Sequence, residues 1–345
     1  MNTILTYLSE NWQRLKLEKY GTPAKLSSVI LTPGFQASSH LIVFVLNKGQ
    51  QAPFLVVKLP RISGDHHRLD LEAESLRRLH ASKSGGYDSV PRVVAYEDWK
   101  DYRLLVETMV QGQIMRPPLI RKQTETCIQA AFNWLQEINQ NTAVCAYKIE
   151  NWFEKLAINS FAALENSFPL LPEEQQLIDQ TRQLIEPLRL AKIPLVFEHG
   201  DFSSPNLMLA NNTDLGVVDW ELAEQHGLPT ADFIFFLTYI AFCKENATKQ
   251  PQQVKAFQNA FFNHENPGWA MPHLRKYCKK LEIPEELLKP LFVLAWTRYV
   301  ANMISRLKGE TGSSSMLSAE TTAWLRKNRF YLLWQYTVKQ FDKIA

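Results

Sequence analysis

The period of the apolar residues changes near residues 108–113, and this change constrains the fold more than any other feature of the sequence. Before it, β-favouring residues gather in short runs separated by loop residues, at 27–31, 41–46 and 54–59. After Gly112 the apolar residues recur at the spacing of amphipathic helices. A strand-rich segment followed by a helix-rich one is typical of an α+β chain, so we expect a small N-terminal β lobe and a larger helical C-terminal lobe.

The same patterns predict the further elements of each lobe. A helix is expected at 65–80, where Leu69 and Ala73 begin an apolar stripe. The other expected elements are strands at 92–96 and 103–108, helices at 124–139, 151–168 and 173–188, and an irregular, β-like segment at 195–221. The boundaries that follow are 1–107 for the β lobe, 108–112 for a hinge and 113–345 for the helical lobe.

Charge and composition argue against several classes of protein. The 38 basic and 35 acidic residues nearly cancel to a net charge of +3, and no dense basic stretch is present, so we expect no nucleic-acid partner. The four cysteines are scattered without a Cys-x-x-Cys pair, which argues against a disulfide framework and fits a reducing cytoplasm. The longest apolar run, 233–243, is too short to span a bilayer, and Glu10 and Arg14 interrupt the N-terminus. We therefore expect a soluble, cytoplasmic protein without a membrane partner.

Two short apolar runs around a turn-forming tetrapeptide predict a β-hairpin. The runs are 207–210 and 215–218, and Asn211-Asn-Thr-Asp214 lies between them. If the last residue of the first run faces the first residue of the second, counting outward brings Asn206 opposite Asp219. An amide oxygen beside a carboxylate suits Mg²⁺, which keeps water and phosphate oxygens as its other ligands.

Asp201 lies in the loop that enters this hairpin, five residues before Asn206. There its carboxylate can take or orient the proton of an attacking hydroxyl group. A metal that clamps phosphates and a carboxylate at the nucleophile are the parts that phosphoryl transfer requires. The segment therefore indicates a phosphotransferase.

The His-Gly-Asp triplet that ends at Asp201, followed by Asn206 and by Asp-Trp-Glu from Asp219, resembles the Brenner-type motif of the aminoglycoside phosphotransferase and choline kinase family. The resemblance extends over about 25–240 and is sharp at 196–232. It implies a bilobal, protein-kinase-like fold, with a small N-terminal antiparallel β lobe with one helix and a larger helical C-terminal lobe. It also implies ATP and Mg²⁺ as cofactors.

Carried over by position, the resemblance implies roles for single residues. Asp201 would be the catalytic base, and Asn206 and Asp219 would be the magnesium ligands. His199 would belong to the scaffold that holds the catalytic loop, and Asp232 resembles a buried, structural aspartate of the family.

The small lobe of such a fold carries a phosphate-binding lysine and a helix glutamate that holds it. Lys58 lies in a predicted strand where kinases place this lysine. Glu72 and Glu74 are the two candidates for its partner. Glu72 shares a helix face with Leu76, four residues later, whereas Glu74 is turned roughly 200° away. We therefore choose Glu72. The alternative is that Lys58 and Glu72 are an ordinary surface lysine and an ordinary surface glutamate, since both residue types are common on such elements.

Two further nucleotide contacts are expected from the small lobe. The loop between the first two strands lacks a Gly-x-Gly-x-x-Gly pattern, but it contains Gly34 and the hydroxyl-bearing Ser38 and Ser39 as candidates for phosphate contacts. An ordinary β-turn explains this loop equally well. In the hinge, backbone groups around Glu107 and Met109 would hydrogen-bond adenine.

The sequence says less about the acceptor than about the nucleotide. Glu221 would face an amine-bearing substrate or would lie at a solvated helix start. Trp269, in a Pro-Gly-Trp loop, is the leading candidate on the substrate side. The aromatic residues of the helical lobe would form a pocket for an apolar or cationic acceptor, or would pack in its core. They include Trp220, Phe235, Tyr239, Trp296, Tyr299 and Trp324.

We therefore expect transfer of the γ-phosphate of ATP to a hydroxyl of a small molecule, such as an aminoglycoside, an amino alcohol, a sugar or a natural product. His-Gly-Asp in place of His-Arg-Asp, and only about ten residues between Asp219 and Pro229, favour this over a kinase of proteins or peptides. A catalytically inactive nucleotide-binding scaffold is the third alternative. Such a scaffold would have no reason to retain the whole set of Lys58, Glu72, Asp201, Asn206 and Asp219.

Overall fold

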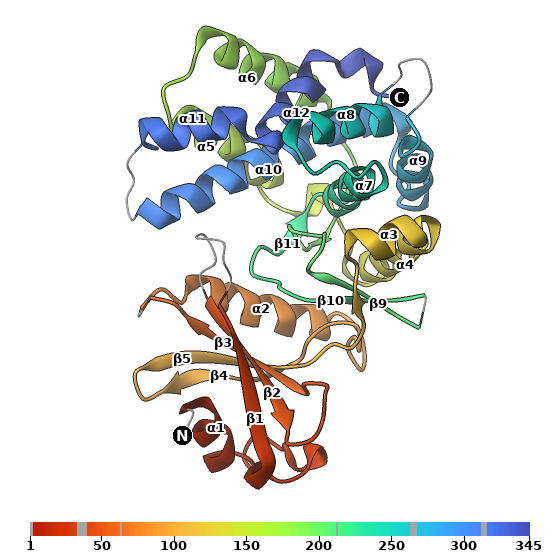
Figure 1. Cartoon of the computed structure of the whole chain (residues 1–345). Helices are drawn as coiled ribbons and strands as arrows, with labels where there is room; N and C mark the ends of the chain where they lie inside the picture. Colours follow the sequence, from red (N-terminus) through yellow and green to blue (C-terminus); the bar gives the residue numbers. More distant parts are fainter. Residues whose placement is uncertain (1–2, 33–39, 63, 212, 263–267, 312–315) are drawn as a thin grey trace. The chain divides into compact units, whose positions relative to one another are not determined.

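The computed structural model describes residues 3–32, 40–62, 64–211, 213–262, 268–311 and 316–345. They form an α+β fold, as expected, that divides into two compact units (Figure 1). The first unit is Met1–Gln113 with Leu215–Ala223, and the second is Ile114–Asp214 with Glu224–Ala345. Residues 215–223, which the sequence analysis assigned to the helical lobe, thus group with the β-rich unit.

The first unit is built on a five-stranded antiparallel sheet with the strand order β1-β2-β3-β5-β4. Its strands are β1 (Leu26–Leu31), β2 (His40–Asn47), β3 (Leu55–Pro60), β4 (Val93–Trp99) and β5 (Tyr102–Thr108). All five strands lie where the sequence predicts them, apart from a few residues at their ends.

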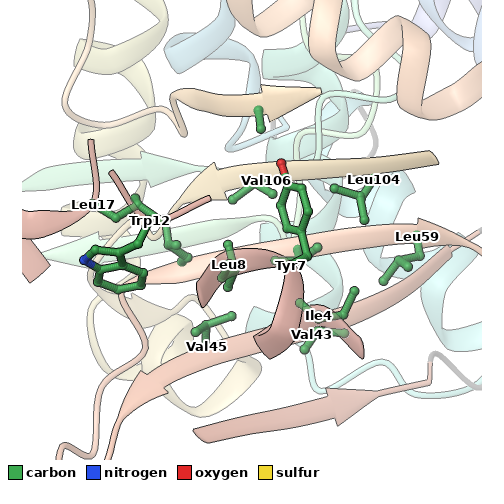
Figure 2. Close-up of a cluster of buried hydrophobic side chains, with 13 residues drawn as sticks. Ile4, Tyr7, Leu8, Trp12, Leu17, Val43, Val45, Leu59, Leu104 and Val106 are labelled. Carbon is green, nitrogen blue, oxygen red and sulfur yellow. The ribbon is translucent and has the colours of Figure 1, made fainter. Parts of the chain in front are cut away.

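Two α-helices accompany this sheet, α1 (Thr3–Glu10) and α2 (His67–Ala81), where one was expected. The unexpected helix α1 places Ile4, Tyr7 and Leu8 at the i, i+3, i+4 spacing of one helix face. These side chains are buried against the sheet in an apolar cluster (Figure 2). Because α1 has only eight residues, its stripe is too short to stand out from the sequence.

The two helices pack on opposite faces of the sheet. In β5, Leu104 and Val106 belong to the cluster that contains α1, whereas Leu105 packs with Leu69 and Ala73 of α2. Successive strand residues point to opposite faces, so the apolar run in β5 serves both layers. The same alternation in β3 directs every second side chain toward α2.

The second unit is mainly helical, as expected. Its α-helices are α3 (Pro117–Lys122), α4 (Thr124–Thr142), α5 (Asn159–Glu165), α6 (Pro172–Ile185), α7 (Ala231–Lys244), α8 (Gln250–Phe261), α9 (Met271–Lys280), α10 (Leu288–Thr311), α11 (Ala319–Lys327) and α12 (Arg329–Lys339). The helix expected at 151–168 is divided into the π-helical segment Glu154–Ile158 and α5. Within the described ranges, no helix combines the length and the apolarity that crossing a bilayer requires.

Short strands and single helical turns complete the chain. The second unit contains a three-stranded sheet of the order β11-β8-β7. The remaining strands are β6 (Gln113–Ile114), β7 (Val144–Cys145), β8 (Pro194–Glu198), β9 (Leu207–Ala210), β10 (Asp214–Val217) and β11 (Glu224–Gly227). The 3₁₀ helices are Glu18–Tyr20, Pro23–Lys25, Ala146–Lys148, Glu186–Leu188, Glu285–Leu287 and Phe341–Lys343.

Candidate active site

Lys58 and Glu72 form a buried ion pair in the first unit. Lys58 lies between Val57 and Leu59 of β3, whose side chains join the α1 cluster, so alternation points Lys58 toward α2. Its Nζ atom lies 2.6 Å and 2.7 Å from the two carboxylate oxygens of Glu72. Glu74 is instead exposed and pairs with a neighbouring arginine of the same helix. The structure therefore brings together the lysine and the glutamate that the sequence analysis selected.

Asp219 joins this pair. Its Oδ1 atom lies 3.1 Å from the Lys58 Nζ atom, and the next residue, Trp220, donates its backbone N–H to Glu72 at 2.9 Å. Burial alone would lower the pKa of Lys58, but the carboxylates of Asp219, Glu72 and Glu107 raise it well above its ordinary value. The ammonium group therefore stays charged at the place where a phosphate-binding lysine is expected.

Side chains of His40, Glu72 and Asp219 lie close enough to hold a metal ion, with their ligand atoms within 4.8 Å of one another. A cation already occupies this cluster, because the Lys58 ammonium group contacts both carboxylates. The His40 ring in turn lies 2.9 Å from a carboxylate oxygen of Glu221. The geometry thus describes a salt-bridge cluster around the lysine.

Glu107 is a buried acid of this unit. It lies on the same face of β5 as Leu105, toward α2, and it is 2% exposed. Its Oε1 atom has no hydrogen-bond partner among the described residues. Burial and then the charge of Glu72 raise the pKa of Glu107 to about 8.

The raised pKa of Glu107 gives the stability of the protein a dependence on pH. The folded state holds a proton on Glu107 between the ordinary pKa of 4.5 and about 8, so stability falls as the pH rises through this window. We expect Glu107→Gln to remove this loss, with a relative gain of up to about 1.4 kcal/mol per pH unit inside the window. Urea unfolding at pH 5, 7 and 9 would measure it.

The exposed Glu74 supplies the matched control for this measurement. Glu74→Gln should change the free energy of unfolding by nearly the same small amount at all three pH values. A gain for Glu107→Gln that is also constant from pH 5 to pH 9 would contradict a raised pKa for Glu107.

The loop that leads to Asp201 in the second unit is held by backbone hydrogen bonds to Asp232. Its carboxylate accepts the N–H groups of His199 at 2.7 Å and of Gly200 at 3.0 Å. The Nδ1 atom of the fully buried His199 accepts the backbone N–H of Asp201 at 3.2 Å. Gly200 has a φ of +83°, a conformation that glycine adopts without strain. Burial and then the charge of Glu198 raise the pKa of Asp232 to about 7.

Asn206 is oriented by the same loop. Its Nδ2 atom donates to the backbone oxygen of Asp201 at 3.0 Å and to the Asp201 carboxylate at 3.2 Å. Because both bonds use the amide nitrogen, the amide oxygen is turned to the other side, where it can serve as a ligand. The Asp201 carboxylate and the Asn206 amide are thus fixed together.

Asp201 also lines a cavity of about 200 Å³ within the second unit. Residues from α7, α10 and α12 form its other walls. The described residues that line it are Asp201, Ser203, Ser204, Phe235, Thr238, Tyr239, Phe242, Tyr299, Arg329 and Phe330. Of the aromatic residues that the sequence offers for a pocket, Phe235, Tyr239 and Tyr299 line this cavity. No local motif marks Arg329, because only the packing of distant helices brings it to the cavity.

The two predicted substrate residues have other surroundings. The Glu221 carboxylate is held by His40 at 2.9 Å and by Arg68 at 3.3 Å, and Glu221 is 8% exposed. The ring of Trp269 is half-buried, with the Lys244 ammonium group 4.3 Å from its centre. Trp269 does not appear among the described residues that line the Asp201 cavity.

The structure gives little support for the predicted phosphate loop and hinge. Gly34, Ser38 and Ser39 lie outside the described residues, so their roles stay predictions. In the hinge, the N–H of Met109 donates to the carbonyl of Phe54 at 3.1 Å. That N–H is therefore engaged, and adenine contacts in this segment stay a prediction.

Comparisons with known proteins identify the family and the fold. The family model described as the phosphotransferase enzyme family matches residues 37–275, more than half of the chain. No curated protein matches. Among solved structures, the GDP complex of aminoglycoside 2'-phosphotransferase-IIIa is 14% identical with a TM-score of 0.54, covering 96% of this chain and 98% of that one.

Two further structures have similar folds. Spectinomycin phosphotransferase APH(9)-Ia, in complex with ADP and spectinomycin, is 12% identical with a TM-score of 0.53, covering 96% of this chain and 98% of that one. The choline kinase LicA from Streptococcus pneumoniae is 12% identical with a TM-score of 0.51, covering 96% and 99%. At identities this low, the solved structures show only that the fold is similar, whereas the match to the family model shows the family. The chain belongs to the phosphotransferase enzyme family and has a protein-kinase-like fold.

Proposed function

We propose that this protein transfers the γ-phosphate of ATP, with Mg²⁺, to a hydroxyl group of a small molecule. The observation that carries the proposal is the Asp201 carboxylate, which is held in a fixed loop at the edge of a cavity that can admit an acceptor. Four free cysteines support a reducing, cytoplasmic location.

In the proposed mechanism, Asp201 orients the acceptor hydroxyl and takes its proton as the oxygen attacks the γ-phosphorus. The new O–P bond forms while the bond from the γ-phosphorus to the β,γ-bridging oxygen breaks, and ADP leaves with that oxygen. Lys58, fixed by Glu72, contacts the phosphates of ATP and offsets their negative charge.

Asn206 and Asp219 are the proposed ligands of Mg²⁺, and their chemistry fits this ion. Each offers a hard oxygen atom, since the Asn206 amide nitrogen is occupied by Asp201 and the Asp219 side chain is 37% exposed. When bound, Mg²⁺ would neutralise charge on the phosphates.

The role of Asp219 can be tested by substitution. Asp219→Ala removes a carboxylate ligand, so we expect the Kd for Mg-ATP to rise at least about tenfold, with a smaller change in the Kd for ATP without Mg²⁺. Calorimetric titration with and without Mg²⁺ would measure both constants. Asp214→Ala, at an exposed carboxylate of β10, is the control and should leave both unchanged. An unaltered Kd for Mg-ATP in Asp219→Ala would remove Asp219 from the metal site.

A transfer screen tests the activity itself. Purified protein with Mg-ATP would be offered aminoglycosides, choline, ethanolamine, sugars and amino alcohols, and ADP release would be compared with that of Asp201→Ala. Acceptor-dependent release that disappears in Asp201→Ala supports the proposal. If only an added protein or peptide acceptor gives ADP release, the protein would instead be a kinase of proteins or peptides. Mg-ATP binding without ADP release with any acceptor would favour an inactive nucleotide-binding scaffold, and absence of both would contradict the proposal.

A further inference from the structure

One face of α7 contributes four of the described residues that line the Asp201 cavity. Phe235, Thr238, Tyr239 and Phe242 line it, at the i, i+3, i+4, i+7 spacing of one helix face. Phe235 and Tyr239 are half-buried, although α7 is otherwise almost completely buried. The helices α10 and α12, which pack on each other in the second unit (Figure 1), contribute further lining residues.

Contacts between aromatic rings connect the parts of the lining that come from α7, α10 and α12. The ring of Tyr299, on α10, stacks on Phe235 with centroids 4.4 Å apart and planes 26° apart. Phe330, on α12, lies 4.7 Å from Tyr299 and 5.7 Å from Phe235. Half of the residues that line the cavity are therefore aromatic, and they offer an apolar surface beside the polar catalytic loop.

Arg329 supplies the cationic group of the cavity. Its guanidinium carbon lies 4.6 Å from the ring centre of Phe330 and 5.8 Å from that of Phe242. Its polar contact is a hydrogen bond to the neutral Gln253 at 3.3 Å, and no ion pair with a carboxylate is found for it in the described part of the chain. Burial lowers the pKa of Arg329, as expected for a cation that has lost water without gaining an anion.

The balance of charge in the cavity follows from its lining. Among the described residues, Asp201 is the only carboxylate that borders the cavity, and it is assigned to the acceptor hydroxyl. A molecule with several ammonium groups would find no second anion there and would meet the Arg329 guanidinium. An anionic group would instead pair with Arg329 through charge-assisted hydrogen bonds.

We propose that the acceptor is a compact hydroxy acid with an apolar or aromatic body, and that Arg329 binds its carboxylate while Asp201 orients its hydroxyl. This inference rests on the proposed function and names the acceptor class of the same site. The volume of about 200 Å³ also favours a body of about one ring, since pockets for drug-sized ligands enclose roughly 300–1,000 Å³.

Three matched probes separate the features of this acceptor. They are 3-phenyllactate, its methyl ester and the amino alcohol phenylalaninol, which share a phenyl ring and a hydroxyl but are anionic, neutral and cationic. Binding to the wild-type protein would be measured by calorimetry with Mg²⁺ and a non-hydrolysable ATP analogue. We expect the acid to bind at least about tenfold more tightly than the ester, and the amino alcohol to bind most weakly.

Variants at Arg329 then test the residue. Arg329→Gln should weaken binding of the acid by roughly 10–100-fold and leave binding of the ester within about threefold. Arg329→Lys should fall between, because it keeps the charge but loses the planar fork. Arg275→Gln is the control, since Arg275 lies on α9 away from the cavity lining, and it should change neither affinity.

The outcomes distinguish this inference from the proposed function. An acid that binds no more tightly than its ester, or a preference that survives in Arg329→Gln, overturns the inference. ADP release with phenylalaninol but not with 3-phenyllactate also overturns it while upholding the proposed function. Loss of the proposed function would appear separately, as a protein that neither binds Mg-ATP nor releases ADP with any acceptor.

Discussion

Asp201→Asn is expected to lower kcat by about 10²–10⁴-fold while leaving the affinity for Mg-ATP and the Tm nearly unchanged. The range is that of a general base placed at the attacking group. Asparagine has the shape of aspartate but cannot accept a proton from the acceptor hydroxyl. The loss should therefore appear in the chemical step rather than in nucleotide binding.

The structure supports this separation of catalysis from folding. The loop is anchored by its neighbours, because His199 is fully buried and its backbone N–H donates to the Asp232 carboxylate. Phe202 is also fully buried, with its ring stacked on Trp134 at 5.4 Å. The hydrogen bond from Asn206 to residue 201 has an acceptor oxygen in the variant as well. The variant thus changes the basicity at one position and little else.

Single-turnover kinetics with a saturating acceptor would measure the effect, with calorimetry for Mg-ATP and thermal unfolding for stability. A kcat within about tenfold of wild type would mean that Asp201 is not the base. A rise in KM for the acceptor with kcat unchanged would instead make Asp201 a binding group.

The family resemblance and one local pattern together predict the Lys58–Glu72 pair. The resemblance identifies Lys58, and helix periodicity then selects Glu72 rather than Glu74 as its partner. Helix periodicity acts over a few residues, so it can be applied without knowledge of the fold. The side chains chosen in this way have atoms that lie 2.6 Å apart in the structure.

Features that depend on long-range packing escape this reasoning. Arg329 lies about 130 residues beyond Asp201, and only the packing of α7, α10 and α12 brings it to the same cavity. The grouping of 215–223 with the first unit has the same cause, since the backbone of Trp220 is bonded to Glu72 of α2. The spacing of residues in the sequence does not predict such contacts between distant segments.

A second long-range contact yields the largest expected effect on stability. Glu198, the last residue of β8, forms a buried ion pair with Arg298 of α10. Glu198 is 5% exposed and Arg298 is 7% exposed. The same carboxylate accepts the backbone N–H of Leu228 at 2.8 Å, and it packs against Gly227, where even a Cβ would meet it at 2.2 Å.

Glu198→Ala should therefore destabilise the second unit by roughly 3–5 kcal/mol, because it leaves the Arg298 guanidinium buried without its anion. Urea unfolding would measure the change. Glu186→Ala is the matched control, since Glu186 pairs with an arginine at an exposed site and its loss should cost less than about 1 kcal/mol. Adding Arg298→Met to Glu198→Ala should restore part of the stability, since the unpaired charge is then removed.

The position of Glu198 makes this substitution test the loop that carries Asp201 as well. Glu198 immediately precedes His199, and Asp232, which binds the loop backbone, feels the charges of both Glu198 and Arg298. In Glu198→Ala the unpaired guanidinium would compete with the loop for the Asp232 carboxylate, so kcat should fall even where the protein is still folded. If stability falls while kcat of the folded protein is unchanged, the ion pair supports the unit without positioning Asp201. If Glu198→Ala lowers the free energy of unfolding by no more than Glu186→Ala does, the buried ion pair does not stabilise the second unit.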